Sequence, residues 1–355
     1  MKRKSLYASL LYHLRWAFLI TIIGILLSIA IGWQITNTLS GTISTVYLCI
    51  ILGIVEISLS CDNAILNAKT LKKMCPVWQK RFLSWGILIA VFGMRIIFPI
   101  MIVCLIAKIS PIEAINLAVY SPTDYLRIIS ESHVPISGFG GTFLMMVSLT
   151  FFLNSKKNIH WIHLLENSMS HLTKIKGIKI FLVLSFVSGI SCILPRNEMY
   201  PFILSSILAL IIFYGINFLE NVLSTNHSPT NYVKGRYGLN LFLYLEIVDA
   251  SLSFDGIISS FAITKNFFII IIGLTIGAVY VRSMTLIILK ENILNKYKYL
   301  EHGSYYSIFI LSIIMFLQTI INIPEVFTGT SSALLILLSI YSSTKNNVNY
   351  SISKR

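Results

Sequence analysis

Ten long runs of apolar residues fill most of this sequence and constrain its fold more than any other feature. The runs lie at about 16–36, 42–67, 83–107, 138–154, 178–194, 201–223, 238–262, 267–289, 304–322 and 326–343. A helix needs about 20 apolar residues to cross the hydrocarbon core of a bilayer, where backbone groups must hydrogen-bond within their own helix. The sequence therefore predicts an all-α, polytopic transmembrane helix bundle of nine or ten spans.

The composition excludes an ordinary soluble protein. Of the 355 residues, 55% are hydrophobic and only 12% are charged, and the mean hydropathy is +0.79. Average soluble domains carry about 25% charged residues. The first run, 16–36, is longer than the core of a signal peptide, and no A-x-A-like site follows it, so we expect a retained anchor.

The net charge of +14 is explained by topology and requires no nucleic-acid partner. If the N-terminus is cytoplasmic, 22 of the 28 Lys and Arg residues fall in cytoplasmic segments, four fall outside, and Arg95 and Arg282 lie within spans. This distribution follows the positive-inside rule. We therefore expect a protein of the bacterial inner membrane, in contact with the lipid bilayer, with both termini in the cytoplasm.

Two of the apolar runs carry the same polar motif. The segments "EISLSCD" at 56–62 and "DASLSFD" at 249–255 share the pattern acid-x-Ser-Leu-Ser-x-Asp. Each motif is followed by a span with one arginine, Arg95 or Arg282. Five predicted crossings separate the motifs, so they run in opposite directions through the membrane. The sequence thus predicts inverted-topology repeats, which many secondary transporters contain.

The repeat also predicts how the chain is divided. The expected parts are a basic tail with the first anchor at 1–40, a first repeat half at 41–177, connecting spans at 178–237, an inverted second half at 238–344, and a basic tail at 345–355.

Six acids fall within the predicted spans: Glu56, Asp62, Glu220, Glu246, Asp249 and Asp255. At about 2.5–3.5 kcal/mol for each ionised acid at a helix centre, they would cost on the order of 15–20 kcal/mol in contact with lipid. They must therefore pair, become protonated or line a hydrated cavity. Glu220, like Glu325 at a turn, lies at a span boundary, and neither is assigned to a site.

Carboxylate, amide and hydroxyl oxygens are ligands for hard divalent cations such as manganese, magnesium or calcium. The predicted metal ligands are Glu56, Asp62, Asn63, Asp249, Asp255 and Glu246, and the predicted polar lining is Ser58, Ser60, Asn67, Ser251 and Ser253. Regular helices would give each motif two adjacent polar faces. A break in each helix, at Asp62-Asn63 and at Asp255-Gly256, would instead give one convergent pocket, and this suits an ion site better.

Other candidate ligands and partners are less informative. The five cysteines form no C-x-x-C pair, so no thiolate metal site is indicated. We expect the seven histidines to be solvated residues of loops and of the N-terminal tail. Arg95 and Arg282 have two open interpretations: they form structural ion pairs with Asp62 and Asp255 or their repeat mates, or they compete with a cation for the same carboxylate.

The segments "EISLSCDNAILNA", "RFLSWGILIAVFGMR" and "EIVDASLSFDGIISSFAI" resemble the TerC family of integral membrane proteins, named for tellurite resistance. "YLEHGSYYSI" and "IPEVFTG" look like motifs of the branch with longer chains. The resemblance implies a LysE-like transporter architecture and metal-ion handling, with manganese export as the associated activity. It maps the acidic motif of the family onto Glu56, Asp62, Asn63, Asp249 and Asp255, with Cys61 as a departure before the first Asp.

We therefore expect an exporter of a divalent cation, with manganese favoured, that works by alternating access and exchanges the cation for protons. No permanently bound cofactor is expected. Two alternatives remain open: a non-transporting membrane scaffold in a stress-resistance complex, and an exporter of small organic cations. An enzyme is not expected, because the sequence has no P-loop, HExxH motif or nucleophile-base pair.

Overall fold

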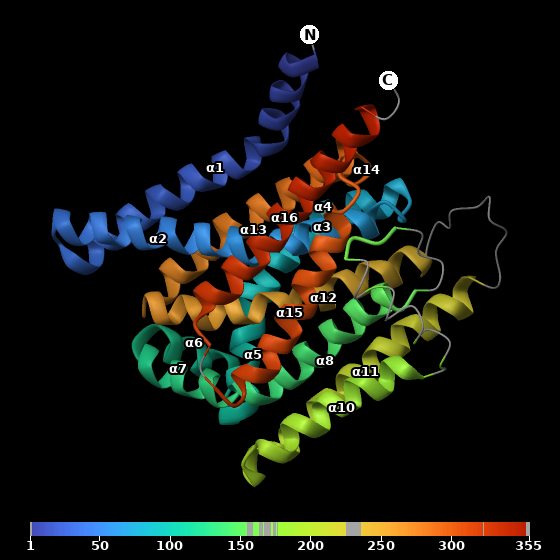
Figure 1. Ribbon diagram of the computed structural model, residues 1–355. Helices are drawn as coiled ribbons and strands as arrows, with labels where there is room; N and C mark the ends of the chain where they lie inside the picture. Colours follow the sequence, from blue (N-terminus) through green and yellow to red (C-terminus); the bar gives the residue numbers. More distant parts are fainter. Residues whose placement is uncertain are drawn as a thin grey trace. The chain divides into compact units, whose positions relative to one another are not determined.

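The computed structural model describes residues 2–154, 159–162, 166, 172, 175, 177–224, 236–321 and 323–352 (Figure 1). The described residues are 88% helical and contain no strand. Seven helices of the described residues are long and apolar enough to cross a membrane: Tyr12–Thr36, Leu39–Leu59, Pro76–Cys104, His133–Phe152, Arg196–Ile216, Phe267–Lys290 and Leu300–Gln318. The prediction of an all-α, polytopic membrane bundle is confirmed.

Every predicted apolar run falls on a helix. The helices are α1 (Lys2–Thr36), α2 (Leu39–Leu59), α3 (Cys61–Leu71), α4 (Pro76–Leu88), η1 (Ile89–Ile97), α5 (Phe98–Ala107), α6 (Pro111–Tyr120), α7 (Pro122–Glu131), α8 (His133–Phe152), α10 (Ile178–Ile193), α11 (Arg196–Ser224), α12 (Arg236–Ile263), α13 (Phe267–Lys290), α14 (Ile293–Lys296), α15 (Leu300–Gln318) and α16 (Glu325–Ile352). The second run is divided between α2 and α3, and the third comprises α4, η1 and α5. The short helices α6 and α7 lie between the third and fourth runs, where no span was predicted. The total of ten spans stays a prediction.

The chain divides into two compact units. Unit 1 contains residues 1–132 and 252–293, and unit 2 contains residues 133–251 and 294–355. The boundary at residues 251 and 252 lies inside α12, so this helix contributes to both units. The units group helices that pack together, whereas the predicted halves follow the sequence repeat. The repeat and its inverted orientation therefore stay predictions.

Helix α13 is the centre of unit 1, where it contacts α1, α2, α3, α4 and η1. Figure 1 shows α1 and α2 as an antiparallel hairpin, with α13 alongside. The backbones of α2 and α13 approach closely because α13 presents Gly273 and Gly277, four residues apart. A Cβ at Gly273 would lie 2.5 Å from Leu52 Cβ and 3.0 Å from the Cys49 carbonyl oxygen. Small residues at this spacing let membrane helices gain dispersion contacts that lipid cannot supply.

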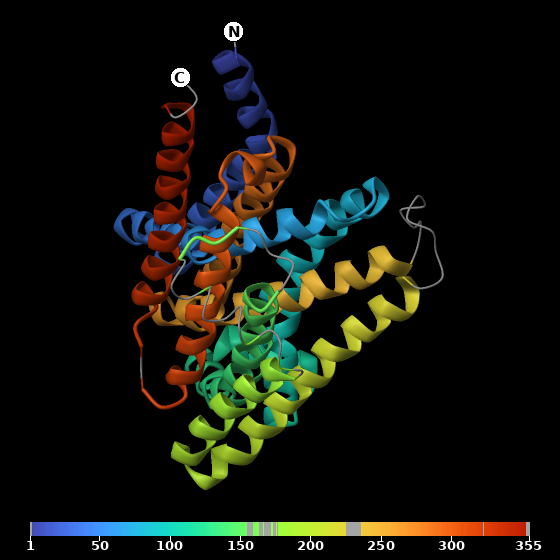
Figure 2. The ribbon, with the colours of Figure 1, turned by 45° about the vertical axis from the view of Figure 1, so that its right-hand side comes forward.

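Helix α8 is the corresponding centre of unit 2. It packs against α10, α11 and α15, and its residues Phe143, Leu144, Met145 and Met146 are all 0% exposed. Figure 2 shows α10 and α11 as a second antiparallel helical pair. Helices α15 and α16 are joined by polar contacts, since the backbone amide of Tyr299 donates to Ser343 Oγ at 2.9 Å. Both units are thus built from spans that bury one face and leave apolar side chains exposed on the other.

The third span contains a stretch of π-helix, η1, at Ile89–Ile97. Pro99 lies two residues after its end, as the second residue of α5. A proline ring clashes with the carbonyl four residues earlier, here that of Arg95, so a wider helical turn before the proline relieves the clash. π-helical turns are rare in proteins as a whole, and many of those that occur lie at functional sites. This segment carries Arg95, which makes it relevant to the polar motif.

We predict that Gly273→Ala destabilises unit 1 by about 1–3 kcal/mol, because the added methyl group overpacks the contact between α13 and α2. Thermal unfolding of the purified protein in detergent measures the effect. The matched control is Gly189→Ala in α10, where an added Cβ meets no atom within 4 Å. Equal unfolding temperatures for the two variants would contradict the close packing of α2 on α13.

Candidate functional site

The helix that carries the first polar motif is interrupted inside the motif. Helix α2 ends at Leu59 and α3 begins at Cys61, with Ser60 between them at φ −106° and ψ 14°. The break lies two residues before the predicted position at Asp62-Asn63. Asp62 is in the first turn of α3, and the backbone amide of Asn63 donates to its Oδ1 at 2.9 Å. A carboxylate in this place satisfies a free amide and interacts favourably with the helix dipole, which explains why α3 restarts here.

The start of α3 buries an unusual number of polar side chains. Asp62, Asn63 and Asn67 are each no more than 2% exposed. Asn67 lies one helical turn after Asn63, and its Oδ1 has no hydrogen-bond partner among the described residues. A buried amide oxygen without a partner costs about 1–3 kcal/mol. The amide oxygen of Asn67 is therefore an oxygen ligand that the packing of α3 does not require.

The acid at the start of the motif, Glu56, forms a buried ion pair with Arg95 of η1. The side chains are 2% and 4% exposed, respectively. Ser60 Oγ donates to Glu56 Oε1 at 3.5 Å, and Arg95 Nη1 donates to the carbonyl oxygen of Ala90 at 2.8 Å. Of the two open interpretations of Arg95, the structural ion pair is present, with Glu56 as its carboxylate.

Two glycines form the other side of the Glu56 pocket. A Cβ at Gly256 of α12 would lie 2.9 Å from Glu56 Oε2, and a Cβ at Gly277 of α13 would overlap the Glu56 side chain. Gly256 directly follows Asp255 in the second motif. Within unit 1, the two motifs therefore meet at Glu56 and Gly256. The Asp255 side chain itself lies outside the described residues, so its predicted role stays a prediction.

The second arginine, Arg282 of α13, is 3% exposed and contacts α4. Its Nη2 donates to the carbonyl oxygen of Gly86 at 3.1 Å, and its guanidinium lies 3.9 Å from the centre of the Phe82 ring. A cation–π contact away from water is worth about 2 kcal/mol. Arg282 therefore links α13 to α4 through backbone and aromatic contacts.

Helix α12 shows no break at Asp255-Gly256, so that part of the prediction is wrong. A glycine weakens a helix by only about 1 kcal/mol, and the close contact of Gly256 with Glu56 favours a regular backbone at this position. Glu246, Asp249 and Ser253 are buried on α12, and Asp249 lies three residues after Glu246. Within that regular helix, these residues share one face.

Two of the predicted lining serines bond to their own helix. Ser58 Oγ donates to the Ile54 carbonyl oxygen and Ser251 Oγ to the Ile247 carbonyl oxygen, both at 2.9 Å. Ser58 is only half-buried, whereas Ser251 is buried. Across the residues with described side chains, no three His, Cys, Asp or Glu residues are grouped so that they could hold a metal ion. This statement does not extend to ligand sets that include Asp255, because the side chain of Asp255 is not described.

The sequence interpretation missed a buried polar cluster in unit 2. Glu166 is 2% exposed and accepts hydrogen bonds from His160 Nδ1 at 3.1 Å and from Tyr306 Oη at 3.2 Å. His302 lies 3.7 Å from the same carboxylate and donates to the Ile159 carbonyl oxygen at 2.9 Å. Glu166 thereby fastens the segment that follows α8 to α15.

This cluster corrects the expectation for two histidines, and a third, His133, is half-buried at the start of α8, where its Nε2 lies 3.4 Å from Ser137 Oγ. His302 is 4% exposed within α15, and the ring of His160 is mostly buried against Glu166, so neither is a solvated loop residue. The four-residue spacing of His302, just before the predicted run 304–322, and Tyr306, at its start, was the available signal. The described residues do not include His163, His171 and His227. The side chains of Glu220 and Glu325 are likewise not described.

These features define a multi-pass helical membrane protein with buried charged groups inside its spans. The model of a family described as "Protein of unknown function (DUF475)" matches residues 61–350, and the chain belongs to this family. The match begins at Cys61, where α3 begins, and includes the second motif. No curated protein and no solved structure matches the chain.

For the buried pair, we predict that Glu56→Gln and Arg95→Gln each destabilise the protein by about 3–5 kcal/mol, because each leaves one buried charge without its partner. The double variant Glu56→Gln/Arg95→Gln should recover most of this loss. Thermal unfolding in detergent, analysed as a double-mutant cycle, measures the coupling.

The control for this cycle is Arg127→Gln, which removes one member of the exposed pair formed with Asp124 at 3.9 Å. Its unfolding temperature should be unchanged, since exposed pairs contribute little. A double variant whose loss equals the sum of the two single losses would show that Glu56 and Arg95 act separately.

For the Glu166 cluster, we predict that Glu166→Gln weakens the contact that α15 makes with the segment following α8. The expected loss is about 1.5–3 kcal/mol, the usual value of hydrogen bonds to a charged group. Limited proteolysis after α8 and thermal unfolding measure the effect. Glu131→Gln, at an exposed position of α7, is the control. Protection from proteolysis equal to that of the unaltered protein would contradict the fastening role.

Proposed function

We propose that this protein is a transporter of the TerC type that exports a divalent metal cation, with manganese favoured, by alternating access. The proposal includes a location in the bacterial inner membrane with both termini in the cytoplasm. The observation that carries it is the interruption at Ser60, which lies inside a membrane-spanning polar motif and is followed by three buried oxygen-bearing side chains. Discontinuous helices form the ion sites of many secondary transporters. Here the irregularity is a single residue, and the backbone amides of Ser60 and Ala64 still donate to the carbonyl oxygens of Glu56 and Ser60 at 3.1 and 3.2 Å.

The side chains around the interruption have the chemistry that the cargo requires. Asp62 supplies a carboxylate, and Asn63 and Asn67 supply amide oxygens, all in the first two turns of α3. Hard divalent cations prefer such ligands and tolerate additional water. The Asn67 Oδ1, without a hydrogen-bond partner among the described residues, is the atom that a bound cation would satisfy.

Charge balance divides the predicted ligands into two groups. Since Arg95 neutralises Glu56, this acid supports the site and adds no net negative charge to it. We assign direct cation binding to Asp62, Asn63 and Asn67, with Asp255 contributed by the second motif. Asp249 and Glu246 of α12 belong to unit 2, and their predicted role as ligands stays a prediction. A carboxylate released by the departing cation can take up a proton, so we propose cation/proton exchange.

One specific observation favours the scaffold alternative. The Glu56–Arg95 pair shows that at least one motif acid is used for helix packing. An explanation based on packing alone leaves the buried Asn67 oxygen without a role. No contact of the described residues favours organic cations over metal ions. An oxyanion site for tellurite would need convergent cationic groups, and Arg95 is committed to Glu56.

The test is uptake of radioactive manganese into inverted membrane vesicles that contain the full chain. We expect Asp62→Asn to abolish uptake, and Asn67→Ala to reduce it by about 10- to 100-fold, as is usual when a group that supports a metal site is lost. Ser58→Ala, in the same motif but bonded to its own helix, should leave uptake unchanged.

The alternatives give different results in this assay. Normal uptake by inserted Asp62→Asn would favour the scaffold. Inhibition of uptake by basic amino acids in excess would favour an exporter of organic cations. Membrane insertion and thermal unfolding of each variant distinguish loss of transport from loss of folding.

A further inference from the structure

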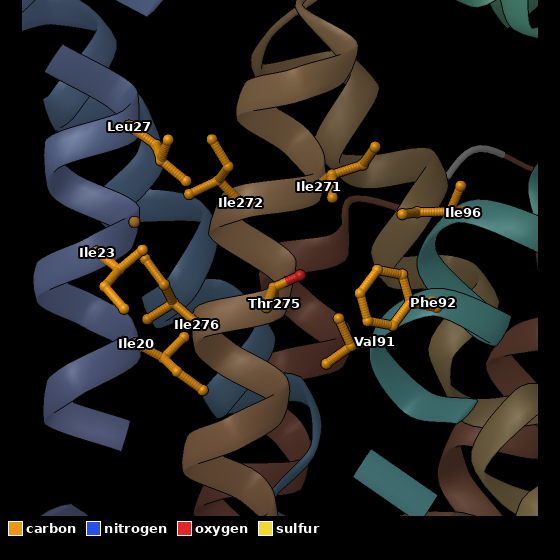
Figure 3. Close-up of a pocket in the computed structure, with 11 residues that line it drawn as sticks. Ile20, Ile23, Leu27, Val91, Phe92, Ile96, Ile271, Ile272, Thr275 and Ile276 are labelled. Carbon is orange, nitrogen blue, oxygen red and sulfur yellow. The ribbon is translucent and has the colours of Figure 1, made fainter. Parts of the chain in front are cut away.

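Unit 1 contains a lateral groove between α1, η1 and α13, with a volume of about 210 Å³ (Figure 3). The groove is lined by Ile20, Ile23, Gly24, Leu27, Val91, Phe92, Ile96, Ile271, Ile272, Thr275 and Ile276. All three walls belong to helices long and apolar enough to cross the membrane. The groove therefore faces hydrocarbon along its whole length.

The chemistry of the lining fits an apolar ligand. Every lining side chain except that of Thr275 is a hydrocarbon, and Figure 3 shows the Thr275 hydroxyl turned toward Phe92 and Ile96. This hydroxyl has no hydrogen-bond partner among the described residues. Thr275 is eight residues after the start of α13, or about 12 Å along the helix, which is near the middle of a hydrocarbon core about 30 Å thick. At that depth the surrounding solvent consists of acyl chains.

The groove is open toward the lipid, and the contact between α1 and α13 prevents these helices from approaching each other to close it. Its rim residues Ile23, Leu27 and Phe92 are 48%, 48% and 52% exposed, so the groove continues the lipid-facing surface of the protein. Helix α1 already touches α13 at Gly24, where an added Cβ would lie 2.8 Å from Ile276 Cδ1. Because this contact prevents α1 from moving closer, a ligand must fill the space to restore the lost dispersion contacts.

We propose that this groove binds one acyl chain of a membrane lipid. A transmembrane helix of a second copy, about 10 Å in diameter, is too wide for a space of this volume. One wall of the groove is η1, so the bound chain packs against the helix that carries Arg95. The lipid thereby stabilises η1 from the side of Val91, Phe92 and Ile96. This inference does not depend on which cargo the protein transports.

The test uses the full-length protein in nanodiscs that contain a phospholipid with a photoactivatable group in the middle of its acyl chain. Mass spectrometry then locates the cross-links. We expect labelling of segments 91–96 and 271–276 above that of Trp85 and Leu88, which are 66% and 57% exposed and are not part of the groove lining. Thr275→Phe fills the groove and should reduce labelling to the level of that reference surface.

Thr275→Val is the matched control, because it removes the same hydroxyl and leaves the volume unchanged. It should retain the labelling of the unaltered protein. Val91→Phe fills the groove from η1 and gives an independent result if Thr275→Phe does not fold. The proposal is overturned if the groove segments are labelled no more than the reference surface, if both filling variants label normally, or if Thr275→Val also loses labelling. Cross-links between two copies through the groove segments would likewise overturn it.

Discussion

The buried ion pair between Glu56 and Arg95 is the interaction on which the rest of unit 1 depends. A single charge left in this position would have neither water nor a counter-ion, so the helices must hold both groups together. Four elements contribute. Helix α2 carries the acid and η1 carries the base, while α12 and α13 place glycines against the carboxylate. The packing of α2 on α13 and the position of α12 therefore follow from the space that one carboxylate needs.

The helices themselves could be predicted from the sequence, because backbone groups in lipid have no alternative to intrahelical hydrogen bonds. The ten apolar runs all fall on helices, and the interruption in the first motif lies two residues from its predicted place. The predicted break in α12 was wrong for a reason that no single sequence contains. Gly256 there provides space for the side chain of Glu56, which is 200 residues away, and does not loosen its own helix.

The Glu166 cluster shows a second limit of reasoning from sequence. Glu166 and His160 come from the segment after α8, and His302 and Tyr306 come from α15, so the cluster exists only after unit 2 has folded. Hydropathy assigned Glu166, His160 and His302 to loops, because a charged side chain next to basic residues usually faces water. The buried Glu166 accepts hydrogen bonds from a phenol, an imidazole and backbone amides instead. Enough donors surround the carboxylate to replace its lost hydration.

Similar sequences in the two motifs thus serve different local structures. The first motif interrupts its helix at Ser60, and the second continues through the equivalent Ser253 without a break. Glycine occupies the place of Asn63 in the second copy, so an amide side chain in one motif corresponds to space beside a glycine in the other. That space is filled by Glu56. In the proposed transport cycle, the second motif therefore contributes both a potential ligand, Asp255, and the surface against which the Glu56–Arg95 pair is held. Any movement of α12 that shifts Asp255 must therefore also disturb the surface that holds the Glu56–Arg95 pair.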